Sequence, residues 1–167
     1  SLRSWNFFPY SRTKYIAANV GGFGIDGALS SAIGGALADT NVPNVLVVGD
    51  LAFFYDLNSI LSRHLPNNLL IILVNNGCGI EFNNKSHIAS KLPFSPNEYI
   101  AAGGHFNSGF KGGSEVLSAS KRSDISLAKA ICSQLSIRYD VCISKEDLSN
   151  ILSKIVDNLG QCTRVLE

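Results

Sequence analysis

The chain lacks methionine altogether and has one tryptophan and three histidines among 167 residues. Its four cysteines form no Cys-x-x-Cys pair, and no histidine lies at zinc-ligand spacing, which argues against a zinc finger or a redox motif. No apolar run approaches the roughly 20 residues that a membrane-spanning helix needs. A net charge of +1 gives no electrostatic reason to expect binding to nucleic acid or an acidic membrane. We therefore expect a cytoplasmic globular protein with reduced thiols.

The length and composition suit one ordinary folded domain. A hydrophobic fraction of 46% and a charged fraction of 16% are slightly more apolar than average, as expected for strands covered on both faces. We expect residues 1–167 to form a single domain. Because methionine is missing even at position 1, we also expect this domain to be a segment of a longer multidomain protein.

Two apolar runs of strand type dominate the first half of the chain, at residues 45–48 and 69–74, and a predicted helix at 53–65 lies between them. An earlier strand at 15–20 leads into a helix whose apolar positions, from Ile25 to Leu37, recur with helical spacing. Tandem strand–helix–strand units predict an α/β fold with a doubly wound parallel sheet flanked by helices.

Periodicity fades in residues 83–122, where glycine and proline are frequent. We expect an irregular, partly mobile loop region beside the active site, with one short helix at 96–102. Order then returns, and Ser144 with Asp147 resembles a capping box for the last helix. The elements expected here are a helix at 124–135, a strand at 138–143, a helix at 144–159 and a final strand at 164–166.

Small polar clusters follow the two central strands: Gly49-Asp50 after the first and Asn75-Asn76 after the second. The carboxyl ends of adjacent parallel strands lie at one edge of a sheet, where α/β proteins bind ligands. A carboxylate and an amide oxygen suit Mg²⁺, which takes its remaining ligands from phosphates and water. The pair predicts a Mg²⁺–diphosphate site. The alternative interpretation is that Asp50 only caps a helix.

The spacing of these clusters resembles the diphosphate-binding signature of thiamine-diphosphate (ThDP) enzymes, with Leu51 in place of the usual third glycine. The longer segments 19–27 and 49–58 resemble the cofactor domain of one branch, the SEPHCHC synthases of menaquinone biosynthesis (2-succinyl-5-enolpyruvyl-6-hydroxy-3-cyclohexene-1-carboxylate synthases). The resemblance extends from about residue 5 to residue 82 and is weak through 83–122. It implies the ThDP-binding fold and a pyrophosphate- and Mg²⁺-binding domain.

The resemblance also implies a role for individual residues. The metal ligands would be the side chains of Asp50 and Asn76 and the backbone carbonyl of Cys78. Backbone N–H groups at Leu51 and Ala52 would bind the diphosphate, and Ile25 would wedge between the two cofactor rings. The full set of implied cofactor contacts is Gly21, Gly24, Ile25, Gly49, Asp50, Leu51, Ala52 and Asn76. Purely structural alternatives remain for these positions. Ile25 would pack in the core, the glycines would form a flexible turn, Cys78 would be a small buried side chain, and Asp26 would be a helix N-cap.

The implied activity is that of a ThDP- and Mg²⁺-dependent transferase or lyase, which decarboxylates a 2-oxo acid and transfers the acyl group. Such enzymes use an activating glutamate from a pyrimidine-binding domain of the same or a partner chain. No glutamate here lies in a comparable motif; the candidates are Glu81, Glu98, Glu115, Glu146 and Glu167. We therefore expect half a site, inactive alone, in a homo-oligomer (dimer or tetramer). His87 and His105 lie in the irregular region, where either could reach a substrate, whereas His64 would end a helix.

Several alternatives stay open. Val20 and Ser11 stand where SEPHCHC synthases have arginines for substrate carboxylates, which favours a less anionic substrate. A related 2-oxo acid decarboxylase or an acetolactate-synthase-like ligase is then the alternative activity. A Rossmann-type nucleotide-binding domain requires Gly-x-Gly-x-x-Gly, which residues 21–24 fit poorly. A non-catalytic subunit would keep the fold without the cofactor.

Overall fold

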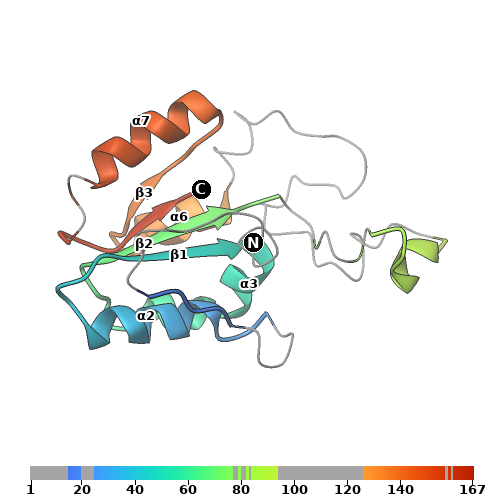
Figure 1. The fold of residues 1–167 in the computed structure, drawn as a ribbon, viewed down its shortest axis with the longest axis horizontal. Helices are drawn as coiled ribbons and strands as arrows, with labels where there is room; N and C mark the ends of the chain where they lie inside the picture. Colours follow the sequence, from blue (N-terminus) through green and yellow to red (C-terminus); the bar gives the residue numbers. More distant parts are fainter. Residues whose placement is uncertain are drawn as a thin grey trace.

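The computed structural model describes residues 15–19, 25–76, 79, 82, 84–93, 126–156, 158 and 160–167. These residues contain a four-stranded sheet in the order β1-β2-β4-β3, in which every neighbouring pair is parallel (Figure 1). The strands are β1 (Asn44–Gly49), β2 (Leu69–Val74), β3 (Arg138–Asp140) and β4 (Arg164–Leu166). The predicted α/β fold with a parallel sheet is confirmed.

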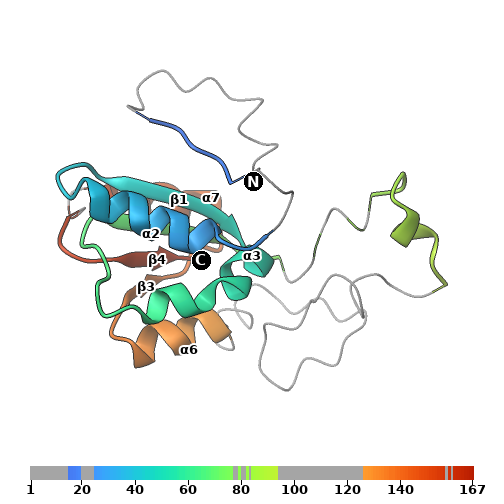
Figure 2. The same ribbon diagram turned by 90° about the horizontal axis from the view of Figure 1, so that it is seen from below.

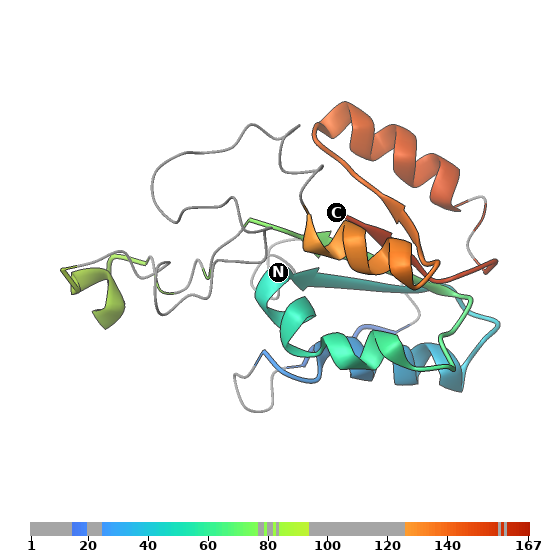
Figure 3. The same cartoon turned by 180° about the vertical axis from the view of Figure 1, so that it is seen from behind.

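Helices cover both faces of this sheet. They are α2 (Ala28–Ala38), α3 (Asp50–Tyr55), η1 (Leu57–Leu61), η3 (Ile88–Lys91), α6 (Leu127–Gln134) and α7 (Lys145–Val156), where η denotes 3₁₀ geometry. In Figure 2, α2, α3 and α6 lie in front of the strands. Figure 3 shows α7 on the opposite side of the sheet from α2. The arrangement is doubly wound, as the tandem strand–helix pattern predicted.

Alternating residues of β2 supply the two cores, because successive side chains of a strand point to opposite faces. Leu69, Ile71 and Leu73 join the larger cluster, which includes side chains of α2, α3, η1 and α6. Leu70 joins the smaller cluster with Ile155 of α7 and with Leu166. A strand buried on both faces is continuously apolar for this reason.

Asn68 joins the end of α2 to the start of β2. Its side chain is 3% exposed, and its Nδ2 lies 3.2 Å, 2.9 Å and 2.7 Å from the carbonyl oxygens of Ala36, Asp39 and Val42. Carbonyls at a helix C-terminus have no partner within the helix. One buried amide therefore donates to carbonyl groups at the end of α2 and in the turn that follows it.

The start of the chain differs from prediction. Residues 15–19 form no strand, and Val20 lies outside the described residues. Helix α2 begins only at Ala28, after Gly27 with φ 76° and ψ 1°, so Gly27 rather than Asp26 is its N-cap. The left-handed conformation favours glycine, which explains the shift. Ile25 precedes the helix and Leu37 is 44% exposed, so the core stripe is narrower than predicted.

The predicted single helix at 53–65 is wrong in extent. Helix α3 begins at Asp50, and the chain leaves α-helical geometry at Asp56 (φ −110°, ψ 23°) before η1. At this break the Asp56 carboxylate accepts hydrogen bonds from Ser30 of α2, and the Asp56 carbonyl accepts from Ser59 N (3.1 Å) in 3₁₀ geometry. Strand β1 also differs, because Val45 is 55% exposed and only Val48 is buried. Within the described residues β1 is an edge strand, which accounts for that exposure.

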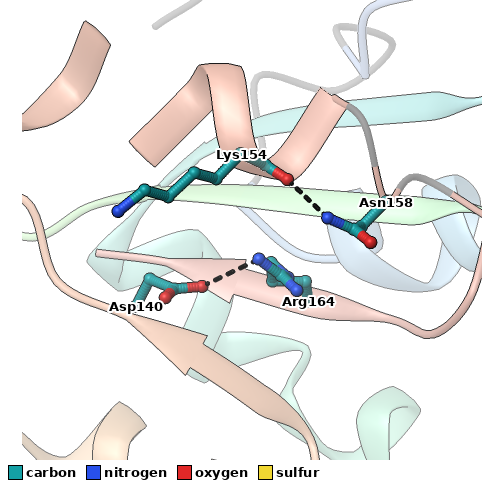
Figure 4. A network of polar contacts seen from close by, with 4 residues as sticks. All are labelled: Asp140, Lys154, Asn158 and Arg164. Atoms are coloured by element: carbon teal, nitrogen blue, oxygen red, sulfur yellow. Dashed lines mark hydrogen bonds and ion pairs between the residues drawn. The ribbon is translucent and has the colours of Figure 1, made fainter. Parts of the chain in front are cut away.

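The second half of the fold follows prediction more closely. Ser144 Oγ accepts a hydrogen bond from Asp147 N (3.1 Å), which confirms the cap of α7. Strand β3 stops at Asp140, whose carboxylate lies 3.3 Å from Arg164 of β4 (Figure 4). Helix α6 begins at Leu127, after the N-cap Ser126. The predicted helix at 96–102 lies outside the described residues, and η3 was not predicted. Nowhere in the described ranges is a helix both long and apolar enough to cross a membrane.

Candidate functional site

Asp50 and Asn76 lie at the same edge of the sheet. In the parallel register Gly49 of β1 pairs with Val74 of β2, and both strands run toward this edge (Figure 1). Asp50 follows Gly49 directly as the first residue of α3, and Asn76 lies two residues beyond Val74. Asp50 is only 2% exposed, whereas Asn76 is half-buried. A buried carboxylate requires compensating polar or cationic partners, and this edge of an α/β sheet is where ligands are bound.

Gly49 leaves open space beside Asp50. Its backbone is extended (φ −79°, ψ 160°), so the conformation itself does not require glycine. A Cβ added there would meet no atom of the described residues within 4 Å. Neither backbone geometry nor crowding explains the glycine. The open space at the strand tip fits a group that approaches the backbone closely.

The first turn of α3 supplies backbone donors at this edge. Asp50, Leu51 and Ala52 are its first residues, and N–H groups in the first turn have no partner within the helix. The side chains of Leu51 and Ala52 are half-buried, and Ala52 packs against the larger core. Leucine is therefore compatible with the start of this helix, in the position where the family signature has glycine.

Ile25 is not part of the hydrophobic core, which was the alternative interpretation of this residue. It precedes α2 and its side chain is 39% exposed, outside both core clusters. The segment around it is tied back by Asn19, whose Nδ2 donates to the Asp26 carbonyl at 2.7 Å. Core packing thus does not account for an isoleucine here, and the predicted contact with a cofactor stays a prediction.

Other predicted site residues fall outside the described residues or have local roles. Gly21, Gly24, Cys78 and His105 lie outside them. His87 Nδ1 accepts a hydrogen bond from Ala89 N (3.1 Å) at the start of η3. His64 follows η1 rather than ending an α-helix. In the ranges that the structure covers, no three side chains of histidine, cysteine, aspartate or glutamate gather at a metal-binding distance.

Another acidic residue, Glu167, lies at the same edge, immediately after β4. Its Oε1 accepts a hydrogen bond from Asn75 Nδ2 (2.5 Å). Its Oε2 accepts from Ser126 Oγ (2.5 Å) and from the Tyr139 hydroxyl (2.6 Å). We call these four residues, Asn75, Ser126, Tyr139 and Glu167, the Glu167 cluster. It links the ends of β2 and β4 to β3 and to the N-terminus of α6.

The carboxylate changes the acidity of groups around it. Burial raises the pKa of the Tyr139 hydroxyl above its usual range, and the hydrogen bond to Glu167 adds to the rise. Burial likewise raises the pKa of the Cys132 thiol to about 12, with a smaller contribution from the Glu167 charge. Glu167 was not among the predicted site residues, because it lies in no glutamate motif. Glu167 could have been identified by the criterion applied to Asp50, which is a polar residue directly after a predicted strand.

Comparison with known proteins adds independent information. No protein-family model matches the chain. It is 46% identical over 79 residues to the 2-succinyl-5-enolpyruvyl-6-hydroxy-3-cyclohexene-1-carboxylate synthase of Bacteroides fragilis, which covers 47% of this chain and 14% of that protein. The enzyme of the same name from Desulfitobacterium hafniense is 39% identical over 103 residues, covering 60% of this chain and 17% of the relative.

A third relative of that name, from Geobacillus kaustophilus, is 46% identical over 75 residues, covering 44% of this chain and 13% of the enzyme. The matched part is thus a small fraction, between 13% and 17%, of each of these longer relatives. All three are enzymes by name. The resemblance predicted from the motifs is confirmed: this chain is similar in sequence to SEPHCHC synthases.

Proposed function

We propose that this chain supplies the diphosphate- and metal-binding half of a ThDP- and Mg²⁺-dependent enzyme that decarboxylates a 2-oxo acid and transfers the acyl group. The observation that carries the proposal is the position of Asp50 and Asn76 at the tips of two hydrogen-bonded parallel strands. The similarity to SEPHCHC synthases gives that position its chemical interpretation. The enzyme would then act in menaquinone biosynthesis, as SEPHCHC synthases do.

The residues at this edge fit a magnesium diphosphate. Asp50 would offer a carboxylate oxygen and Asn76 an amide oxygen, which are ligands that Mg²⁺ prefers. The carbonyl of Cys78 would be the third protein ligand. The space beside Gly49 and the N–H groups of Leu51 and Ala52 would receive the diphosphate oxygens. A single carboxylate balances only part of the positive charge of Mg²⁺, and the anionic diphosphate would balance the rest.

The bound cofactor would supply the stabilisation of negative charge that loss of CO₂ from a 2-oxo acid requires. The residues of this chain anchor and orient it. Ile25, partly exposed just before α2, would hold the two rings in a bent arrangement, with Gly21 and Gly24 allowing close backbone approach. Binding that fixes geometry lowers the entropy lost on reaching the transition state.

The activating glutamate would come from a pyrimidine-binding domain of the same or a partner chain, in a homo-oligomer. The chain alone would then bind the cofactor weakly and catalyse no reaction. The specific 2-oxo acid depends on residues that contact the substrate. Val20 and Ser11 in place of arginines favour a less anionic substrate than that of SEPHCHC synthase, so a related decarboxylase or acetolactate-synthase-like ligase is the second candidate.

Calorimetric titration of the intact enzyme with ThDP, with and without Mg²⁺, tests the proposal. We expect Mg²⁺-dependent binding that D50N weakens by roughly 100-fold or more, equivalent to about 2.8 kcal/mol. The matched control is D147N, which removes an exposed carboxylate in α7 on the far face of the sheet. It should bind as the wild type does.

Other outcomes would point elsewhere. Binding of ThDP that is independent of Mg²⁺, or that D50N leaves intact, contradicts the proposed metal site. Binding of NAD would favour a Rossmann-type nucleotide domain. No binding of either ligand by the intact enzyme would favour a non-catalytic subunit.

A further inference from the structure

We propose that Glu167 is a positioning residue that holds the Asn75-Asn76 strand tip in the conformation that binds the metal. The inference rests on the proposed function, because it assigns a task to a residue outside the predicted ligand set. Its basis is the Glu167 cluster, in which one carboxylate accepts hydrogen bonds from three side chains.

Glu167 is itself held by the sheet. Its backbone N–H donates to the Asp140 carbonyl (3.0 Å), and its carbonyl accepts from Cys142 N (2.6 Å). These bonds continue the pairing of β3 and β4 beyond the last strand residues. Two side-chain hydroxyls then fix the carboxylate: that of Ser126, which also caps α6, and that of Tyr139 in β3. The acceptor is thus held in place by contacts within the protein.

The carboxylate determines how the Asn75 amide is turned. An ionised carboxylate only accepts hydrogen bonds, so the NH₂ side of the amide must face Glu167. The opposite atom, Oδ1, is buried and has no hydrogen-bond partner among the described residues. An amide without Glu167 would gain by turning toward another donor or toward water. The hydrogen bond to Glu167 therefore fixes the orientation of the Asn75 side-chain amide, at the residue before Asn76.

Asn76 is the residue whose position this contact controls. It follows Asn75 directly, at a strand end where the ladder between β1 and β2 has stopped. A ligand at such a tip must be oriented by contacts beyond the first shell, and loss of such contacts weakens metal binding by roughly 10–100-fold. Glu167 acts on the site through Asn75 and touches neither metal nor cofactor in this scheme.

The test compares E167A with E167Q in the intact enzyme. E167A removes the acceptor of Asn75. E167Q retains one carbonyl oxygen for Asn75 Nδ2, and its amide can donate to the hydroxyls of Ser126 and Tyr139, which also accept. We expect the Kd for ThDP at fixed Mg²⁺ to rise roughly tenfold or more in E167A. E167Q should restore most of the affinity.

A destabilised control outside the cluster separates positioning from general loss of structure. N68A removes a buried hydrogen-bond group between α2 and the amino end of β2, outside the Glu167 cluster. It should lower the free energy of unfolding yet leave the Kd for ThDP within about twofold of wild type, a difference of about 0.4 kcal/mol. If E167A fails to fold, N75A removes the same hydrogen bond from the other side and should weaken binding similarly.

Several results would overturn the inference. If E167A, or N75A in its place, binds ThDP as tightly as the wild type does, the positioning role of Glu167 is wrong. The proposed function is not affected by that result. An equal rise in Kd in N68A would show that stability alone is responsible. Wild-type enzyme without Mg²⁺-dependent ThDP binding would overturn both the proposed function and this inference.

Discussion

Asp56 caps helix α2 from 26 residues away in the sequence. Its Oδ2 accepts hydrogen bonds from the backbone N–H of Ser30 (2.6 Å) and from the Ser30 hydroxyl (2.8 Å). Ser30 lies in the first turn of α2, and the N-cap residue Gly27 has no side chain to serve that turn. The carboxylate thus occupies the place of a missing N-cap side chain and lies where the helix dipole favours negative charge.

Replacement of this capping carboxylate should loosen the start of α2. We expect D56A to lower the free energy of unfolding by about 1–2 kcal/mol, the usual effect of losing a helix cap. S30A loses only the hydroxyl contact and should have a smaller effect. Urea denaturation followed by circular dichroism measures both. Equal stability of D56A and wild type would show that water replaces the cap without penalty.

Asn68 should be among the most sensitive polar positions. N68A removes the donor shared by the carbonyls of Ala36, Asp39 and Val42, and we expect a loss of about 1–3 kcal/mol in the free energy of unfolding. N68D has the same shape but turns an acceptor toward those carbonyls, so it should lose more. The order is checked by denaturant unfolding at neutral pH. N68D as stable as N68A would contradict the assignment of Nδ2 as the donor.

Phe53 fills the centre of the larger core. It is 0% exposed, and its ring meets that of Phe54 edge-on with centroids 5.2 Å apart. We expect F53A to lower the free energy of unfolding by about 3–5 kcal/mol, because it removes apolar burial and leaves a cavity. Tyr55 in the same helix is 71% exposed, so Y55A should stay within about 0.5 kcal/mol of wild type. Similar losses in both variants would contradict the described orientation of α3.

Stability should fall in strongly alkaline solution. The pKa of Cys132 is about 12 in the folded protein against an ordinary value of 9.0, so between these pH values the folded state binds more protons than the unfolded state. The free energy of unfolding then decreases as the pH rises from about 9 toward 12, and the contribution is complete below pH 9. The raised pKa of Tyr139 acts in the same direction.

Unfolding measured across this pH range in wild type and C132A checks the sign. The decrease should be shallower in C132A, whatever the effect of the substitution at neutral pH. Parallel curves would show that folding does not raise the pKa of Cys132. A second readout is alkylation at pH 8, where Cys132 should react more slowly than the half-buried Cys142 and Cys162 because its thiolate is scarce.

Local patterns in the sequence predicted some elements well. The unbroken apolar run at β2 was recognisable because both of its faces are buried, and Ser144 marked the start of α7 because capping is a local interaction. The edge shared by Asp50 and Asn76 followed from parallel pairing alone. Their role as metal ligands stays a prediction, which the titration above tests.

Features that depend on tertiary contacts were not predictable in this way. The helix divides at Asp56, whose carboxylate contacts Ser30, far away in the sequence. The importance of Glu167 depends on the strand order, which brings β4 between β2 and β3 so that its end lies within reach of Asn75 and Tyr139. The exposure of Val45 reflects the position of β1 at the sheet edge. None of these tertiary relations can be recognised from the local spacing of apolar residues in the sequence.

The Glu167 carboxylate has a consequence for how this part of the sequence can vary. Asn75 and Ser126 stand just before and just after the long intervening stretch, and both donate to that one side chain. The two ends of the stretch are therefore pinned by the sheet, independently of its length. Lengthening a closed loop is entropically cheap, ~0.6 kcal/mol for each doubling. Outside the predicted ligands Asn76 and Cys78, insertions and deletions between these two anchors can accumulate while the parallel core is kept.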